Sequence, residues 1–111
     1  MRRSVESAQR KVRMLALRIE GSTGTPTLEG LDALQCTIVD TGTGHYTITV
    51  TDAFAEACHA VGNCEAVDKA VTLTCTASVI VVKVNDIDET AALSDGDVQL
   101  LIIGHDVTDN Y

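Results

Sequence analysis

The sequence of 111 residues has no tryptophan, one proline and only three aromatic side chains. Proteins that bind single-stranded nucleic acid normally stack bases on aromatic rings, so this class is disfavoured. The longest mainly apolar stretch, Ala77–Val84, contains Ser78 and Lys83 and is far shorter than the roughly 20 residues that span a bilayer. Basic residues between 10 and 18 interrupt the apolar run that a signal peptide needs. We therefore expect no contact with a membrane. We also expect the first residues to belong to the mature protein and not to a signal peptide.

Positive charge is scarce outside the first twenty residues. Residues 1–20 carry a net charge of +4, and residues 21–111 carry −12. We expect residues 1–11 to form a basic N-terminal arm that contacts an acidic surface on a neighbouring protein subunit. The predicted contact residues are Arg2, Arg3, Arg10, Lys11 and Arg13. Nucleic acid is the other acidic candidate, but the acidic body would repel phosphates, so we expect no nucleic-acid partner.

The hydrophobic and charged fractions of the chain are those of a folded protein. Forty-five per cent of the residues are hydrophobic and 22% are charged, which excludes the low-hydrophobicity composition of disordered chains. A chain of this length makes one domain, and no repeat or linker divides it. We expect a single domain over residues 12–111.

The segments 34–39 and 45–51 predict a β-hairpin. Side chains in both segments alternate with a period of two, and residues 40–44 between them are of the kinds that adopt positive φ in tight turns. The return strand sets Tyr46, Ile48 and Val50 against threonines, so we expect these three side chains to be buried.

Period-two alternation predicts further strands at 12–19 and 70–75. The β-branched run at 79–84 and the segment 98–103 predict two more. The first of these segments also fits a helix, and the second and third predict another hairpin. Residues 21–30 and 85–97 predict surface loops. Residues 52–62 fit either a short helix capped by Asp52 or a strand over 57–61. Six or seven short strands predict an all-β fold, a small β-sandwich or jelly-roll-like domain with the N-terminal basic arm.

Four cysteines and three histidines raise the question of a zinc site, because thiolates and imidazoles are the ligands that zinc prefers. Only Cys58, His59 and Cys64 cluster, and adjacent residues of an extended chain point to opposite faces. Cys36 and Cys75 lie among apolar strand residues, where a free thiol packs as a small hydrophobe. We expect free thiols and no metal, with a Cys58–Cys64 disulfide as the alternative.

Acidic residues gather in the loop expected at 85–97. They are Asp86, Asp88, Glu89, Asp95 and Asp97. The ligand order of a calcium-binding loop is incomplete, so we expect a solvated loop. The sequence contains no nucleophile elbow, no zinc-protease motif and no phosphate-binding glycine loop. We therefore expect no enzyme activity, no catalytic residue and no cofactor.

Three segments, Thr43–Phe54, Val79–Asn85 and Asp95–Asp106, together resemble small virion structural proteins of tailed bacteriophages. In that family a strand of the form Gly-x-Tyr-x-Ile-x-Val leads into a Phe-containing segment, paired strands, an Asp-rich turn and a final strand ending in Gly-x-Asp. The matching residues are Gly44, Tyr46, Ile48, Val50, Phe54, Asp95, Asp97, Gly104 and Asp106. The likeness covers about residues 16–106 and does not include the cysteines or the basic start.

The resemblance implies a compact, commonly trimeric β-domain in the virion, assembled in the cytoplasm of the bacterial host. It also favours a strand near Cys58. The expected function is capsid decoration, or cement, with partners that are other copies in a homotrimer and the major capsid protein or other virion subunits. The alternatives are a tail, fibre or baseplate component that binds a carbohydrate or receptor, and a small metal- or thiol-binding β-module.

Overall fold

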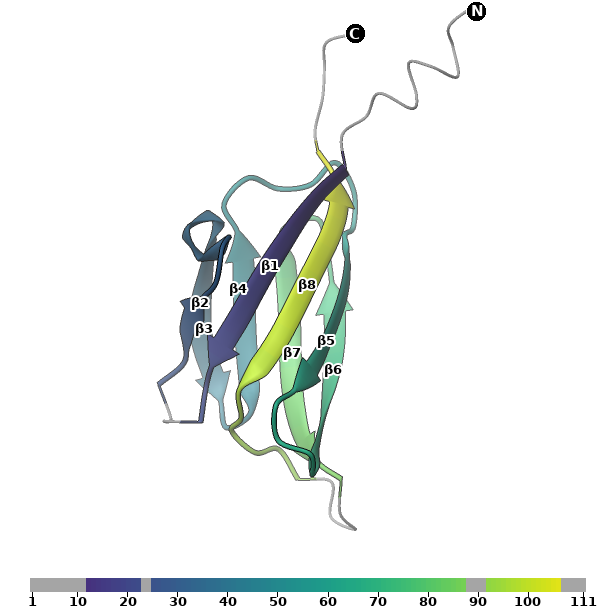
Figure 1. Ribbon diagram of the computed structural model, residues 1–111. Helices are drawn as coiled ribbons and strands as arrows, with labels where there is room; N and C mark the ends of the chain where they lie inside the picture. Colours follow the sequence, from purple (N-terminus) through teal and green to yellow (C-terminus); the bar gives the residue numbers. More distant parts are fainter. Residues whose placement is uncertain (1–11, 23–24, 88–91, 107–111) are drawn as a thin grey trace, which may run out of the picture.

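The protein folds into two antiparallel four-stranded sheets that pack face to face as a β-sandwich (Figure 1). A computed structural model describes residues 12–22, 25–87 and 92–106. The strands are β1 (Val12–Glu20), β2 (Thr27–Glu29), β3 (Cys36–Gly42), β4 (His45–Val50), β5 (His59–Cys64), β6 (Lys69–Cys75), β7 (Val79–Asp86) and β8 (Val98–His105). A 3-10 turn, Ala33–Gln35, precedes β3. The predicted all-β sandwich is confirmed.

The first sheet has the order β2-β1-β8-β5 and the second has the order β3-β4-β7-β6. β1 and β8 pair along the whole of β8, from Val12 opposite His105 to Ile19 opposite Val98. The chain therefore enters the sandwich at Val12 and leaves it at the same end, next to Asp106 (Figure 1). β5 and β6 are consecutive in the chain but belong to different sheets.

The core lies between the sheets and takes one face from each of the long strands. Its fully buried side chains include Leu15, Ile19, Tyr46, Ile48, Val50, Ile80, Val82, Val84, Val98 and Ile102. In a strand, successive side chains point to opposite faces, so a strict apolar alternation places every second side chain in this layer. Burial of these groups is the main favourable contribution to folding.

Both predicted hairpins are present. β3 pairs with β4, and β6 pairs with β7 in the register Cys75 to Ile80. The β3–β4 turn passes through Gly44, whose φ of +61° is in the left-handed region that favours glycine. Tyr46, Ile48 and Val50 are buried, as the sequence predicted.

Three details of the sequence prediction were wrong. Residues 27–29, expected within a loop, form the short strand β2 on the edge of the first sheet. Leu34, expected in a strand, lies in the 3-10 turn and is 99% exposed. The expected loop at 85–97 starts later, because β7 continues to Asp86. Of the two alternatives left open for residues 52–62, the structure has a strand, which begins at His59.

Residues shared with the phage-protein pattern make close structural contacts. The Tyr46 hydroxyl donates to Asp95 Oδ1 at 3.2 Å, and the same Oδ1 accepts the Gly44 N–H at 2.8 Å. Burial raises the pKa of Tyr46 to about 12. Gly104 lies under the Phe54 ring, where a Cβ would overlap the ring atoms. These residues therefore fix loops onto the core.

The first prediction tests the register of β4. Ile48 is fully buried, whereas its neighbour Thr49 is exposed. We expect Ile48→Ala to lower the free energy of unfolding by about 2 to 5 kcal/mol, as is usual for large-to-small changes in a core. Thr49→Ala should cost much less. Chemical denaturation measures both values, and a larger loss for Thr49→Ala would mean that the register is shifted by one residue.

Candidate interaction surface

The exposed side of the first sheet carries a band of apolar side chains, here called the apolar face. Strand register places its members in adjacent rows: Val12, Met14 and Ala16 on β1, Leu101 and Ile103 on β8, and Val61 on β5. Val12, Met14 and Val61 are 58%, 56% and 63% exposed. Contiguous apolar side chains on a protein surface commonly mark an interaction site.

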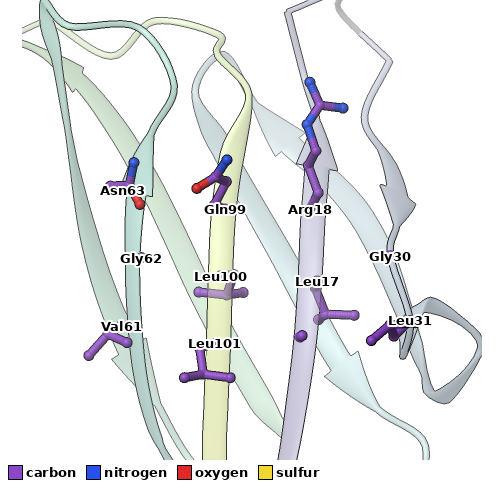
Figure 2. A pocket seen from close by; sticks show the side chains of 11 residues that line it. Leu17, Arg18, Gly30, Leu31, Val61, Gly62, Asn63, Gln99, Leu100 and Leu101 are labelled. Carbon is purple, nitrogen blue, oxygen red and sulfur yellow. The ribbon is translucent and has the colours of Figure 1, made fainter.

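A shallow hollow lies on this face beside β2. Figure 2 shows the residues around it, which come from β1, β5, β8 and the segment after β2. Leu31, which is 93% exposed, stands at one side, and Val61 stands at the other. At Gly62 a Cβ would lie 2.7 Å from the carbonyl oxygen of Gln99, so glycine permits the close approach of β5 to β8 here.

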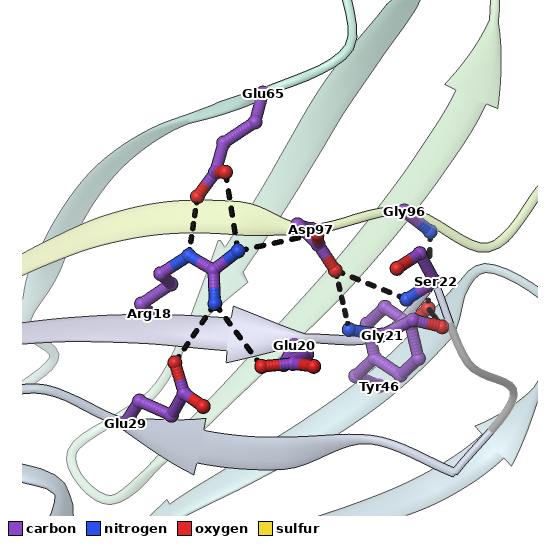
Figure 3. A network of polar contacts seen from close by, with 9 residues as sticks. All are labelled: Arg18, Glu20, Gly21, Ser22, Glu29, Tyr46, Glu65, Gly96 and Asp97. Carbon is purple, nitrogen blue, oxygen red and sulfur yellow. Dashed lines mark hydrogen bonds and ion pairs between the residues drawn. The ribbon is translucent and has the colours of Figure 1, made fainter.

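The apolar face ends at an ion-pair cluster, here called the Arg18 network, which joins Arg18 to Glu20, Glu29, Glu65 and Asp97 (Figure 3). Arg18 Nε donates to Glu65 at 2.6 Å, and Nη1 donates to Glu29 at 2.8 Å. These bonds, with Glu65 contributing most, raise the pKa of Arg18 above its usual value. One guanidinium faces four carboxylates, so this end of the face stays acidic.

Carboxylates in the Arg18 network have pKa values shifted in opposite directions. Glu20 faces Glu29, and this neighbour raises the pKa of Glu20 despite the presence of Arg18. Partial desolvation alone would raise the pKa of Asp97. The N–H groups of Ser22 and Gly21, which donate to its Oδ1 at 3.0 and 2.9 Å, outweigh this effect and lower the pKa overall. Asp97 thus ties the segment after β1 to the start of β8.

At the opposite end of β1, Arg13 points to the inner side of the sheet. Its Nε lies 2.7 Å from Asp106 Oδ1, and its guanidinium carbon lies 4.4 Å from the centre of the Phe54 ring. It also donates to the backbone carbonyl of Asp52. The Arg13 charge is therefore matched within the chain. The other predicted contact residues, Arg2, Arg3, Arg10 and Lys11, lie outside the described residues.

The acidic residues of 85–97 separate into individual contacts. Asp86 pairs with Lys69 at 2.8 Å, Asp95 holds Tyr46 and Gly44, and Asp97 belongs to the Arg18 network. Asp88 and Glu89 lie outside the described residues. Within the described part of the chain, no group of three or more histidine, cysteine and acidic side chains is arranged to hold a metal ion.

The four thiols are free, and three of them are buried. Cys58 donates its thiol to the Thr76 carbonyl at 3.2 Å. Its pKa is raised to about 11, mainly by burial and also by the thiol of Cys75 beside it. The side chain brought next to Cys58 is thus Cys75 of the neighbouring sheet, while Cys64 lies near Gly96 at the other end of β5.

The sequence contained a signal for the apolar face that the period-two analysis did not use. Both sides of the segment 12–19 are rich in apolar residues, because Met14 and Ala16 alternate with Leu15 and Leu17. A strand with one solvated face normally carries polar side chains on that face. The apolar excess at Met14 and Ala16 therefore indicated a second surface for contact.

Comparisons with protein-family models, curated proteins and solved structures give no significant match. No helix in the described part of the chain is long and apolar enough to cross a membrane.

The second prediction concerns Asp97. Because the native pKa of Asp97 is lowered, its ionised form stabilises the fold above the unfolded pKa of about 3.9. This contribution is lost as the pH falls through the native value. Asp97→Asn should lower the unfolding free energy by on the order of 1 kcal/mol at pH 7. The difference from wild type should shrink below about pH 4. An unchanged difference at pH 3, measured by urea denaturation, would contradict this assignment.

The third prediction concerns the thiols. Denatured protein should react with a thiol reagent at all four cysteines. In the native protein Cys58 should react slowest at pH 8, because it is 3% exposed and its pKa is about 11. Cys75, the least buried of the four, should react first, and Cys75→Ser should remove the fastest phase. Stoichiometric zinc that is lost together with the fold on chelation would refute the assignment of free thiols.

Proposed function

We propose that this protein is a non-enzymatic structural component of a tailed-bacteriophage virion, a homotrimeric decoration or cement protein of the head. Its partners in this role are other copies of the chain and the major capsid protein or neighbouring virion subunits. The proposal places the protein in the virion, after assembly in the bacterial cytoplasm.

The observation that carries the proposal is an exposed apolar face at one end of which a basic segment of the sequence joins the sandwich. The apolar face offers exposed side chains of Met14 and Val61 on the first sheet. The basic residues of 1–11 are joined directly to Val12, at one end of that face. A cement protein needs several contacts at once, and interfaces combine an apolar centre with a polar border.

The sequence resemblance supports the same role. Its matching residues make the contacts that shape the sandwich, such as Tyr46 with Asp95 and Gly104 with Phe54. A domain this small gains stability when it buries further surface in an oligomer. The likeness therefore concerns the scaffold that the proposed role requires.

Localisation on intact particles tests the proposal. Antibodies against the chain should label the heads of purified particles of the phage that encodes it. The number of copies per head should be a multiple of three. Labelling confined to tails or fibres would favour the tail-component alternative. Absence of the chain from purified particles would refute a virion role.

The fourth prediction assigns particle attachment to the basic residues of 1–11. Deletion of residues 1–11 should leave the sandwich folded, because β1 begins at Val12, while occupancy on particles falls. Replacing Arg2, Arg3 and Arg10 by glutamine should reduce occupancy similarly, because arginine pairs well with carboxylates. Wild-type occupancy should also fall as salt rises, since exposed charges are screened within about 10 Å at 0.1 M.

Lys83→Gln is a matched control for loss of a positive charge, because Lys83 is exposed on β7 of the opposite sheet. This variant should keep wild-type occupancy. If the truncated protein attached as well as wild type at every salt concentration, the basic residues would have no docking role.

A further inference from the structure

Two cysteines lie opposite each other where the two sheets meet along one side of the sandwich (Figure 1). β5 ends at Cys64, the chain crosses to the second sheet through residues 65–68, and β6 returns to Cys75. Cys58, directly before β5, and Cys75, the last residue of β6, therefore lie at the open end of this arch. The backbone N–H of Cys58 donates to the carbonyl of Thr76 at 3.2 Å, which holds the two ends together.

The two thiols interact directly in the space between the sheets. Cys58 belongs to the buried core, and Cys75 packs against that core from β6. Burial, charge repulsion from the Cys75 side chain and a hydrogen bond with it together raise the pKa of Cys58 to about 11. The Cys58 thiol also donates to the carbonyl of Thr76, the residue after Cys75, at 3.2 Å. The sulfur of Cys58 is thus placed next to that of Cys75.

The other two cysteines are too far from this pair to be bridged to it. A disulfide needs two Cα atoms within about 7 Å of each other. Cys58 and Cys64 are joined by extended chain, and six steps of about 3.3 Å place their Cα atoms roughly 20 Å apart. Cys36 is on β3, and the order β3-β4-β7-β6 puts three strand spacings of about 4.8 Å between β3 and β6. One pair, Cys58 with Cys75, therefore has the required proximity.

We propose that Cys58 and Cys75 form a disulfide between the two sheets when the protein meets a low-molecular-weight disulfide such as oxidised glutathione. The bond closes the open end of the β5–β6 arch and fastens the first sheet to the second. In a reducing compartment both thiols stay free, as they are in this structure. The reaction does not depend on a virion role.

The reaction begins at Cys75, because its thiol is the more exposed of the two. The Cys75 thiolate attacks one sulfur of oxidised glutathione, the S–S bond of glutathione breaks, and one glutathione leaves as a thiolate. Cys58 then loses its proton to water, and its sulfur attacks the Cys75 sulfur and displaces the second glutathione. In total the two protein thiols lose two protons and two electrons, and oxidised glutathione is reduced to two molecules of glutathione.

The fifth prediction identifies the bond by peptide mapping. Native protein is incubated with oxidised glutathione at about pH 8, where thiol–disulfide exchange proceeds, then alkylated and digested with trypsin without reduction. Cleavage after Lys69 separates Cys75 from the other three cysteines. Peptides 19–69 and 70–83 should be recovered as a disulfide-linked pair, and fragmentation should place the bond at Cys58. Four free thiols, a bond within peptide 19–69, or a product of twice the single-chain mass would overturn the proposal.

Three variants test the order of the reaction. Cys58→Ser should stop at a mixed disulfide of Cys75 with one glutathione, and Cys75→Ser should give neither this adduct nor linked peptides. Cys64→Ser is the matched control, because Cys64 is a buried cysteine at the other end of β5, and it should give the same linked pair as wild type. Circular dichroism checks that each variant is folded, and the wild-type peptide map decides the assignment without them. Linked peptides in Cys58→Ser would overturn it.

The bond should also stabilise the sandwich, because closing the loop of residues 58–75 removes conformational freedom mainly from the unfolded chain. The Tm of oxidised wild type should exceed that of the reduced protein by on the order of 10 °C, and dithiothreitol should remove the difference. Cys58→Ser should show no such shift after the same treatment. A linked protein with an unchanged Tm would contradict a bond that fastens the two sheets.

Discussion

The burial of one face of each long strand between two sheets is the constraint on which the rest of the structure depends. A slip of one residue would turn Ile48 outward and bury its neighbours Thr47 and Thr49 in the core, so the core fixes the register of the strand pairs. The ends of the layer are closed by polar side chains. Arg13 with Asp106 closes one end, and Tyr46 with Asp95 closes the other. Because these charged and polar groups pair within the chain, the exposed sheet faces are left for other contacts.

Much of the fold could be predicted because it follows from alternation. The first hairpin and β6 alternate with a period of two, and β7 and β8 are apolar runs of strand length. β2 was missed because three residues between Pro26 and Gly30 are too few to show a period, and β2 exists only by pairing with β1. Leu34 was misplaced since alternation continued through it, whereas the backbone turns at Ala33–Gln35 before β3 begins.

The candidate surface was less accessible to sequence analysis, for a geometric reason. The apolar face joins Met14, Val61 and Leu101, which lie on three strands far apart in the chain. The sheet order β1-β8-β5 brings them together, and no local pattern specifies that order. Arg13 shows the opposite case. Its charge predicted a contact residue of the basic arm, but its position on β1 directs its side chain toward Phe54 and Asp106.

The pairing of β1 with β8 makes the sandwich mechanically directional. The chain enters at Val12 and leaves at Asp106, at the same end of an antiparallel pair (Figure 1). Force that pulls these two points apart opens the ladder from one end, and its hydrogen bonds break one after another. Force that pulls residue 12 along the axis of β1, against a sandwich held elsewhere, loads all the bonds together, because they lie perpendicular to the strand. The resistance of the fold to load thus depends on which two points carry it.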